Sequence, residues 1–168
     1  MTDAHSYSRG VTSTLYSRDI LRLAASIPHL GRLPDPEASV ERNSPVCGSR
    51  VVVDLSLDEA GHVGAIGMVV KACALGQASA ALLGRHIIGS DATALAAASE
   101  ALGAFLAGDR EDPGDWPGLE VFAEARRFSA RHPSIRLAFE AASEAAAQAE
   151  ATAPASARRS SRPSRLPG

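Results

Sequence analysis

Two cysteines have the clearest potential for chemistry in this 168-residue chain. Cys47 lies in the turn-like segment SPVCGSR, and Cys73 lies in VVKACALGQASA, where a predicted strand passes into a predicted helix. The positive end of the helix dipole and the charge of Lys71 favour the thiolate there, the form that binds metals and attacks electrophiles. Spacing alone leaves three interpretations open for the pair: metal ligands, reactive thiols, or small buried hydrophobic side chains.

Other chemical patterns are weak in this sequence. The chain has no glycine-rich phosphate loop, no CxxC pair and no G-x-S-x-G nucleophile turn. His29 and His62 fall in predicted turns and His86 falls on a predicted helix, so we expect structural or solvated roles for all three. We therefore expect any reactive site to centre on the two thiols.

Charge and hydropathy narrow the range of partners. The chain has 17 Lys and Arg against 19 Asp and Glu, a net charge of -2 and a pI of about 6.2. This balance gives no reason to expect a nucleic acid or a membrane as a partner. No basic segment followed by an apolar core begins the sequence, and no apolar run approaches the roughly 20 residues that span a bilayer. We expect a cytoplasmic protein with reduced cysteines.

Alternating apolar residues predict the strands that position the cysteines. Residues 51–57 alternate as a strand with one buried face, and residues 63–71 form the return strand after the DEAGH turn. Residues 38–42 could form a third, short strand. If the return strand keeps its geometry to its end, Lys71 and Cys73 project together, away from the core face.

Helical spacing covers most of the remaining chain. We expect helices over residues 13–27, 73–89, 90–108 and 119–128, and a last helix with Pro133 in its first turn. Ser13 or Thr14 could cap the first helix, and Ser90 or Asp91 the third. Trp116, between two prolines, should anchor a loop to the domain.

These elements predict a single α+β domain, a small three-stranded antiparallel meander packed against several helices. Its expected boundaries are residues 13–150, after a flexible N-terminus at residues 1–12. Residues 151–168 are rich in Ala, Ser, Pro and Arg and lack periodicity, which predicts a disordered tail.

Three segments resemble a known family in their order and spacing. LYSRDILRLAASIPHLGRL resembles the opening helix and loop of the IscU/NifU/SufU-type iron–sulfur cluster scaffolds. SPVCGSRVVVDLSLDEAGHV is similar to the family's N-P-x-C-G-D strand entry and acidic hairpin, and KACALGQASAALLG resembles its G-C-A-I-S-x-A-S helix start. The resemblance covers roughly residues 14–145, and the insertion at about residues 108–132 is more similar to the SufU-like branch.

The resemblance implies both a fold and a function. It implies three antiparallel strands packed on helices, in agreement with the periodicity. It also implies a non-enzymatic protein that receives persulfide sulfur from a cysteine desulfurase, assembles or carries a cluster, and passes it to recipient apo-proteins. Family members use three cysteines and an aspartate as ligands, and Cys47 and Cys73 match the first two cysteines.

The chain departs from the family pattern at the remaining ligands. Ser49 stands where the family has its aspartate, and Leu137 is expected at the position of the third cysteine. Stable zinc or two-iron sites usually need four protein ligands. His132 could add a weak ligand, and a homodimer could supply two thiolates from each chain.

Three functions therefore stand as hypotheses. The leading one is an iron–sulfur cluster scaffold or carrier that binds iron or a labile cluster through Cys47 and Cys73, with zinc as another possible metal. The first alternative is a sulfur acceptor that takes persulfide from a cysteine desulfurase on either cysteine without holding a cluster. The second is a diverged partner-binding domain without metal, for which both sulfurs would be buried and far apart.

Overall fold

The fold places a three-stranded antiparallel sheet beneath two layers of helices. The computed structural model describes residues 15–153. The strands are β1 (Ala38–Asn43), β2 (Arg50–Leu57) and β3 (Val63–Lys71), in the order β1-β2-β3. The register sets Val53 of β2 opposite Val40 of β1 and Met68 of β3, and all three side chains are buried. The predicted α+β meander is therefore confirmed.

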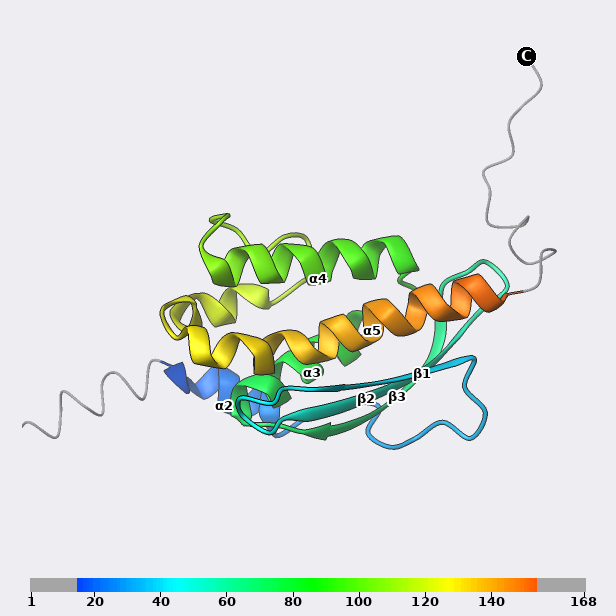
Figure 1. Cartoon of the computed structure of the whole chain (residues 1–168), viewed down its shortest axis with the longest axis horizontal. Helices are drawn as coiled ribbons and strands as arrows, with labels where there is room; N and C mark the ends of the chain where they lie inside the picture. The colour runs from blue at the N-terminus through cyan, green and yellow to red at the C-terminus, as the bar shows by residue number, and fades with distance from the viewer. Residues whose placement is uncertain (1–14, 154–168) are drawn as a thin grey trace, which may run out of the picture.

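The helices cover one face of this sheet, as Figure 1 shows. They are α2 (Arg18–Ala24), α3 (Ala74–His86), α4 (Ala92–Ala107) and α5 (His132–Thr152), with two 3-10 segments, η1 (Leu119–Arg127) and η2 (Ser129–Arg131). The long α5 lies between α4 and the sheet and also packs against α3. Its buried face consists largely of alanines, whose small side chains let the helix approach the elements on both sides.

The opposite face of the sheet is also covered, which the alternation did not predict. Asp54 of β2 has no exposed side-chain surface and accepts hydrogen bonds from Arg32, Ser39 and the Leu33 N–H, at 2.6 to 3.1 Å. Burial raises the pKa of Asp54, but these donors outweigh that effect and the net pKa is lowered. A side chain at Gly67 would collide with the segment that crosses this face.

The ends of the helices agree with most of the predicted signals. Asp91 caps α4 by accepting from the Ala94 N–H at 2.8 Å, and Gly108 ends it with a φ of 86°. Pro133 lies in the first turn of α5, as predicted. The helix predicted over residues 119–128 is a 3-10 helix instead, and α2 is shorter than predicted and is capped by Ser17.

Some predicted features fall outside residues 15–153. Ser13 and Thr14, the predicted caps of the first helix, lie outside the described residues, as do residues 1–12 and 154–168. The last helix continues to Thr152, two residues past the predicted boundary of the domain at residue 150. Among the described residues, no helix combines the length and the apolar character that a membrane crossing requires.

Trp116 anchors the loop between α4 and η1, as predicted. Its indole Nε1–H donates to the Leu82 carbonyl of α3 at 3.0 Å, and its ring meets the Phe139 ring of α5 edge-on, with 5.4 Å between centroids. The side chain is only 8% exposed. The loop is thus tied to α3 and α5, which fixes η1 beside α3.

Candidate functional site

The first thiol lies at the tip of the hairpin loop between β1 and β2. The Ser44 N–H donates to the Ser49 carbonyl and the Gly48 N–H to the Ser44 carbonyl, both at 2.8 Å. The first bond adds one pair, Ser44 and Ser49, to the register of β1 and β2. Gly48 turns the chain with a φ of 70°, a conformation that favours glycine. Cys47 is exposed at the tip, whereas Ser44 and Ser49 are buried beneath it, at 2% and 4% exposure.

The second thiol lies at the N-terminus of α3. Strand β3 ends at Lys71, and Cys73 is the N-cap residue of α3. The Cys73 side chain is half-buried and packs against the hydrophobic core, whereas Lys71 is exposed. The strand geometry ends before the cysteine, so the condition under which both side chains were expected to project together is not met.

Ser134, in the first turn of α5, joins the two thiols. Its Oγ lies 3.3 Å from the Cys73 Sγ and 3.2 Å from the Ser49 Oγ, and the Cys47 Sγ donates to the Ser49 Oγ at 3.1 Å. A continuous path of polar contacts therefore runs from one sulfur to the other through two hydroxyls. We refer to Cys47, Cys73, Ser44, Ser49 and Ser134 together as the thiol–serine cluster.

Small residues on α3 allow α5 to place Ser134 there. A Cβ atom at Gly76 would overlap the Ser134 Oγ and the Ala72 Cβ, so only glycine fits without a shift of the helices. One turn later, the buried Ser79 Oγ donates to the Ile135 carbonyl at 2.6 Å. The segment GQAS of α3 thus holds the first turn of α5 against the first turn of α3.

The surroundings of Cys47 stabilise its thiolate. Desolvation by neighbouring atoms raises the pKa of Cys47, although the residue is exposed by area. The hydroxyls of Ser44, Ser49 and Ser134 can donate to the sulfur once it is charged, and this effect outweighs desolvation, so the net pKa is lowered. The N-termini of α3 and α5 both lie at the cluster, and their dipoles also favour negative charge.

The structure corrects the expectation for Leu137. It also gives the His132 ring a backbone partner. Leu137 is 4% exposed and belongs to the hydrophobic core, so Ser134, one turn earlier, is the α5 residue beside the thiols. The His132 Nε2 lies 2.8 Å from the Ala125 carbonyl oxygen. No three His, Cys, Asp or Glu side chains form a potential metal-binding group within residues 15–153.

Ser44 and Ser134 belong to the site but were not predicted from the sequence. Ser44 carried a signal, because it stands three residues before Cys47 in the loop. Ser134 begins the SIRLAF segment that was considered for the third ligand, but the helical pattern does not say which of its residues meets α3. The resulting cluster offers two thiols and three hydroxyls, a set that suits a nucleophilic thiolate better than a closed metal site.

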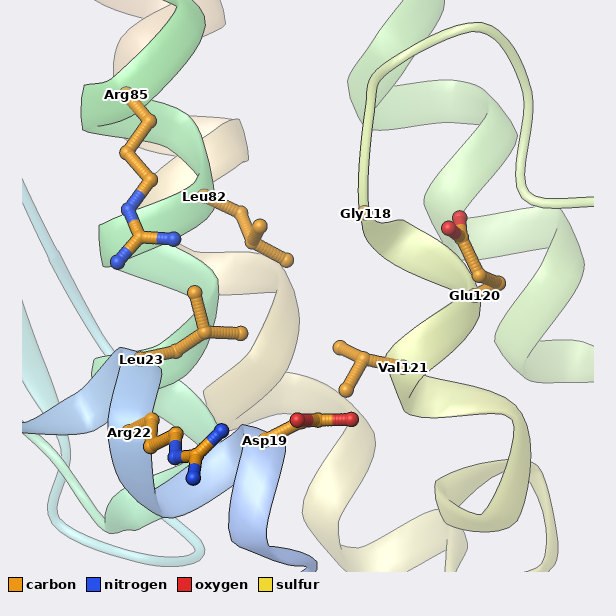
Figure 2. A pocket seen from close by; sticks show the side chains of 8 residues that line it. All are labelled: Asp19, Arg22, Leu23, Leu82, Arg85, Gly118, Glu120 and Val121. Atoms are coloured by element: carbon orange, nitrogen blue, oxygen red, sulfur yellow. The ribbon is translucent and has the colours of Figure 1, made fainter.

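A separate cleft of about 620 Å³ lies between α2, α3 and η1. Figure 2 shows its apolar centre, formed by Leu23, Leu82 and Val121. Arg22 and Arg85 extend from the α2 and α3 side, and Asp19 and Glu120 complete the charged lining. None of the lining residues belongs to the thiol–serine cluster, and none is a cysteine, serine or histidine, so the cleft lacks a nucleophile of these kinds.

Comparison with known proteins places the chain among iron–sulfur scaffolds. No family model and no curated protein matches the sequence. The N-terminal domain of a NifU-like protein from Brucella abortus matches with a TM-score of 0.79 and 34% identity, over 85% of this chain and 99% of that structure.

Two further solved structures share the fold. One is a putative iron–sulfur cluster assembly scaffold of the SUF system from Fervidobacterium islandicum AW-1, with a TM-score of 0.74, 17% identity, and coverage of 80% of this chain and 98% of that one. The other is a hypothetical protein, with a TM-score of 0.71, 23% identity and the same coverage. The fold and the 34% identity to the Brucella protein together show that this chain belongs to the IscU/NifU/SufU-type iron–sulfur cluster scaffold family.

Proposed function

We propose that this protein serves iron–sulfur cluster assembly as a scaffold or carrier, and that Cys47 accepts persulfide sulfur from a cysteine desulfurase. The sulfur would then pass to a growing cluster or to a recipient apo-protein. Similarity to the NifU-like domain supports the general role. The observation that supports sulfur acceptance is the exposed Cys47 thiol, whose pKa is lowered by hydrogen bonds from serine hydroxyls despite desolvation.

Sulfur transfer to Cys47 needs only a nucleophilic thiolate. The Cys47 sulfur attacks the outer sulfur of a cysteine persulfide on the desulfurase, a new S–S bond forms, and the S–S bond of the donor breaks. The donor cysteine leaves as a thiolate, and the transferred sulfur releases its proton to water, because a persulfide ionises readily. No net oxidation occurs, so the step requires neither a metal nor a further reductant.

A second candidate function is the holding of iron or a labile cluster through Cys47 and Cys73. The contacts that link both sulfurs through Ser49 and Ser134 favour it, because they bring the thiols to one surface of the domain. One chain contributes two of the four ligands that a two-iron cluster usually needs. The same linkage argues against a partner-binding domain without chemistry, for which buried and distant sulfurs were expected.

The test for sulfur acceptance combines the protein with a cysteine desulfurase and free cysteine under anaerobic conditions. We expect faster desulfurase turnover and a mass gain of one sulfur atom on Cys47. Cys47→Ser should abolish both effects. The matched variant Cys73→Ser should keep the adduct, because the hydroxyls around Cys47 remain. No stimulation and no adduct in the wild type would overturn the proposal.

Cluster binding is tested separately by reconstitution with ferrous iron and sulfide. Visible absorption that disappears in the Cys47→Ser, Cys73→Ser double variant would support the second candidate. A colourless and iron-free wild-type protein under these conditions would leave sulfur acceptance as the remaining chemistry of the site.

A further inference from the structure

Ser44 contains a buried hydroxyl without a partner. The residue is 2% exposed, and within residues 15–153 its Oγ finds no hydrogen-bond partner. Its backbone is fully used, since the N–H donates to Ser49 and the carbonyl accepts from Gly48. A buried polar atom without a partner destabilises the fold, so this hydroxyl is free to donate to a group that forms on Cys47.

The unpaired hydroxyl lies beside the Cys47 sulfur. Ser44, Ser49 and Ser134 are the three serines whose side chains act on this sulfur. In the neutral thiol the S–H group donates to the Ser49 Oγ, so the sulfur offers Ser44 little negative charge to bind. An anionic sulfur at this place would accept from hydroxyls on several sides, as charge-assisted acceptors do.

A persulfide on Cys47 supplies such an anion. Adding one sulfur extends the Cys47 side chain by an S–S bond of about 2.05 Å. The outer sulfur of a persulfide ionises more readily than a thiol, so it is an anion near neutral pH. Hydroxyl groups can donate to it, whereas a carboxylate in the same place would repel it.

We infer that Ser44, Ser49 and Ser134 form a hydroxyl cradle that holds the persulfide anion on Cys47, with Ser44 donating to the outer sulfur. This inference rests on the proposed function and adds the groups that keep the transferred sulfur bound. Ser49 and Ser134 bridge toward Cys73, whereas Ser44 has no contact to give up. The persulfide therefore gains a donor that the thiol does not use.

The cradle predicts opposite effects of Ser44→Ala on the stability of the fold and on the lifetime of the Cys47 persulfide. Removing an unpaired buried hydroxyl should leave the melting temperature unchanged or higher, because no hydrogen bond is lost. The same change should shorten the lifetime of the Cys47 persulfide roughly tenfold, since a donor to a charged acceptor is removed. A merely structural role for Ser44 would not separate these two readouts.

The experiment loads wild type, Ser44→Ala and Ser44→Thr with sodium tetrasulfide, and in parallel with desulfurase and cysteine. Blocking and intact-mass measurement then follow the decay of the adduct, and peptide mapping assigns it to Cys47. We expect rapid decay in Ser44→Ala and a lifetime near that of the wild type in Ser44→Thr, which keeps the hydroxyl. Ser134→Ala, which removes a hydroxyl from α5, provides a second variant should Ser44→Ala fail to fold.

The two loading routes separate this inference from the proposed function. A stable adduct from tetrasulfide without loading by the desulfurase would contradict the proposed donor and leave the cradle supported. Equal decay in wild type, Ser44→Ala and Ser134→Ala would overturn the cradle even if the desulfurase loads Cys47. The absence of any Cys47 adduct with both donors would overturn the cradle as well.

Discussion

Ser134 shows how one side chain changes the chemistry available to a thiol pair. Its hydroxyl lies 3.3 Å from the Cys73 sulfur and contacts Ser49, which in turn binds Cys47. A serine hydroxyl keeps its proton near neutral pH and is a weak metal ligand, whereas a thiolate in the same place would bind strongly. The side-chain atom at residue 134, oxygen or sulfur, therefore distinguishes a sulfur-accepting site from a zinc-binding site.

Ser134→Cys should create a three-thiol metal site. We expect the affinity for zinc to rise roughly 100-fold, because structural zinc sites gain about 3 kcal/mol for each of their ligands. Competition titration with a chromogenic chelator measures this change. Leu137→Cys is the matched control, since it adds the same thiol to α5 but within the hydrophobic core. An equal gain in both variants, or none in Ser134→Cys, would contradict the assigned geometry.

The ionisation of Cys47 gives a prediction for pH dependence. In a Cys73→Ser background, alkylation by iodoacetamide should follow the Cys47 thiolate, with a midpoint at lower pH than that of free cysteine measured alongside. Removing a donor by Ser49→Ala destabilises the thiolate, so the midpoint should move to higher pH and the rate at pH 7 should fall. A midpoint at or above that of free cysteine in the Cys73→Ser protein would show that desolvation outweighs the hydroxyls.

The sequence predicted the two thiols of the site but not the hydroxyls between them. Cys47 and Cys73 were identified because cysteines are rare and stand at element boundaries. Ser134 was missed in favour of Leu137, because the SIRLAF segment was matched to the family's R-I-K-C-A-x-L pattern, and such a match does not determine how the helix is rotated against a neighbour. That rotation depends on how α5 packs on Gly76, a contact between residues far apart in the chain.

At the scale of elements, the contact between the first turns of α3 and α5 positions the cluster. Gly76 leaves space for Ser134, and the Ser79 hydroxyl holds the Ile135 carbonyl. The sheet shows a similar dependence on distant residues. Asp54 alternates with Val53 and Leu55 and therefore suggested a solvated face, yet the Arg32 segment covers it. The strands follow from local patterns, whereas the coverage of their faces follows from chain segments that those patterns do not describe.

Gly76→Ala should move α5 away from the cluster. The added methyl group would overlap the Ser134 hydroxyl and the Ala72 side chain, so we expect a loss of stability of about 1 to 3 kcal/mol from overpacking. Thermal unfolding measures the loss, and the yield of Cys47 persulfide should fall with it. Gly103→Ala is a useful comparison, because Gly103 packs closely on the Arg136 guanidinium of α5, away from the thiols. A normal persulfide yield in Gly76→Ala would show that the helix contact does not position Ser134 for this chemistry.

At the scale of the whole molecule, one described domain offers two thiols at one site, and two copies would offer four. Beside Cys47 the Val46 side chain is 73% exposed, the highest exposure among the large hydrophobic residues of the described chain. A second copy that faces this loop would bring two more thiolates to the same place and cover both valines. The usual four ligands of a two-iron cluster would then be complete.

Any two-iron cluster held by this protein should therefore be bound by two chains. Anaerobic reconstitution followed by native mass spectrometry should give a dimer with one cluster, which returns to monomers when a chelator removes the iron. Val46→Glu should weaken the dimer without removing a ligand, because it places two like charges where the loops meet. Ile88→Glu is the control, since Ile88 is also half exposed but lies after α3, at the opposite end of that helix from Cys73. A cluster bound to single chains at full occupancy would contradict shared ligation and would require further ligands from the same chain.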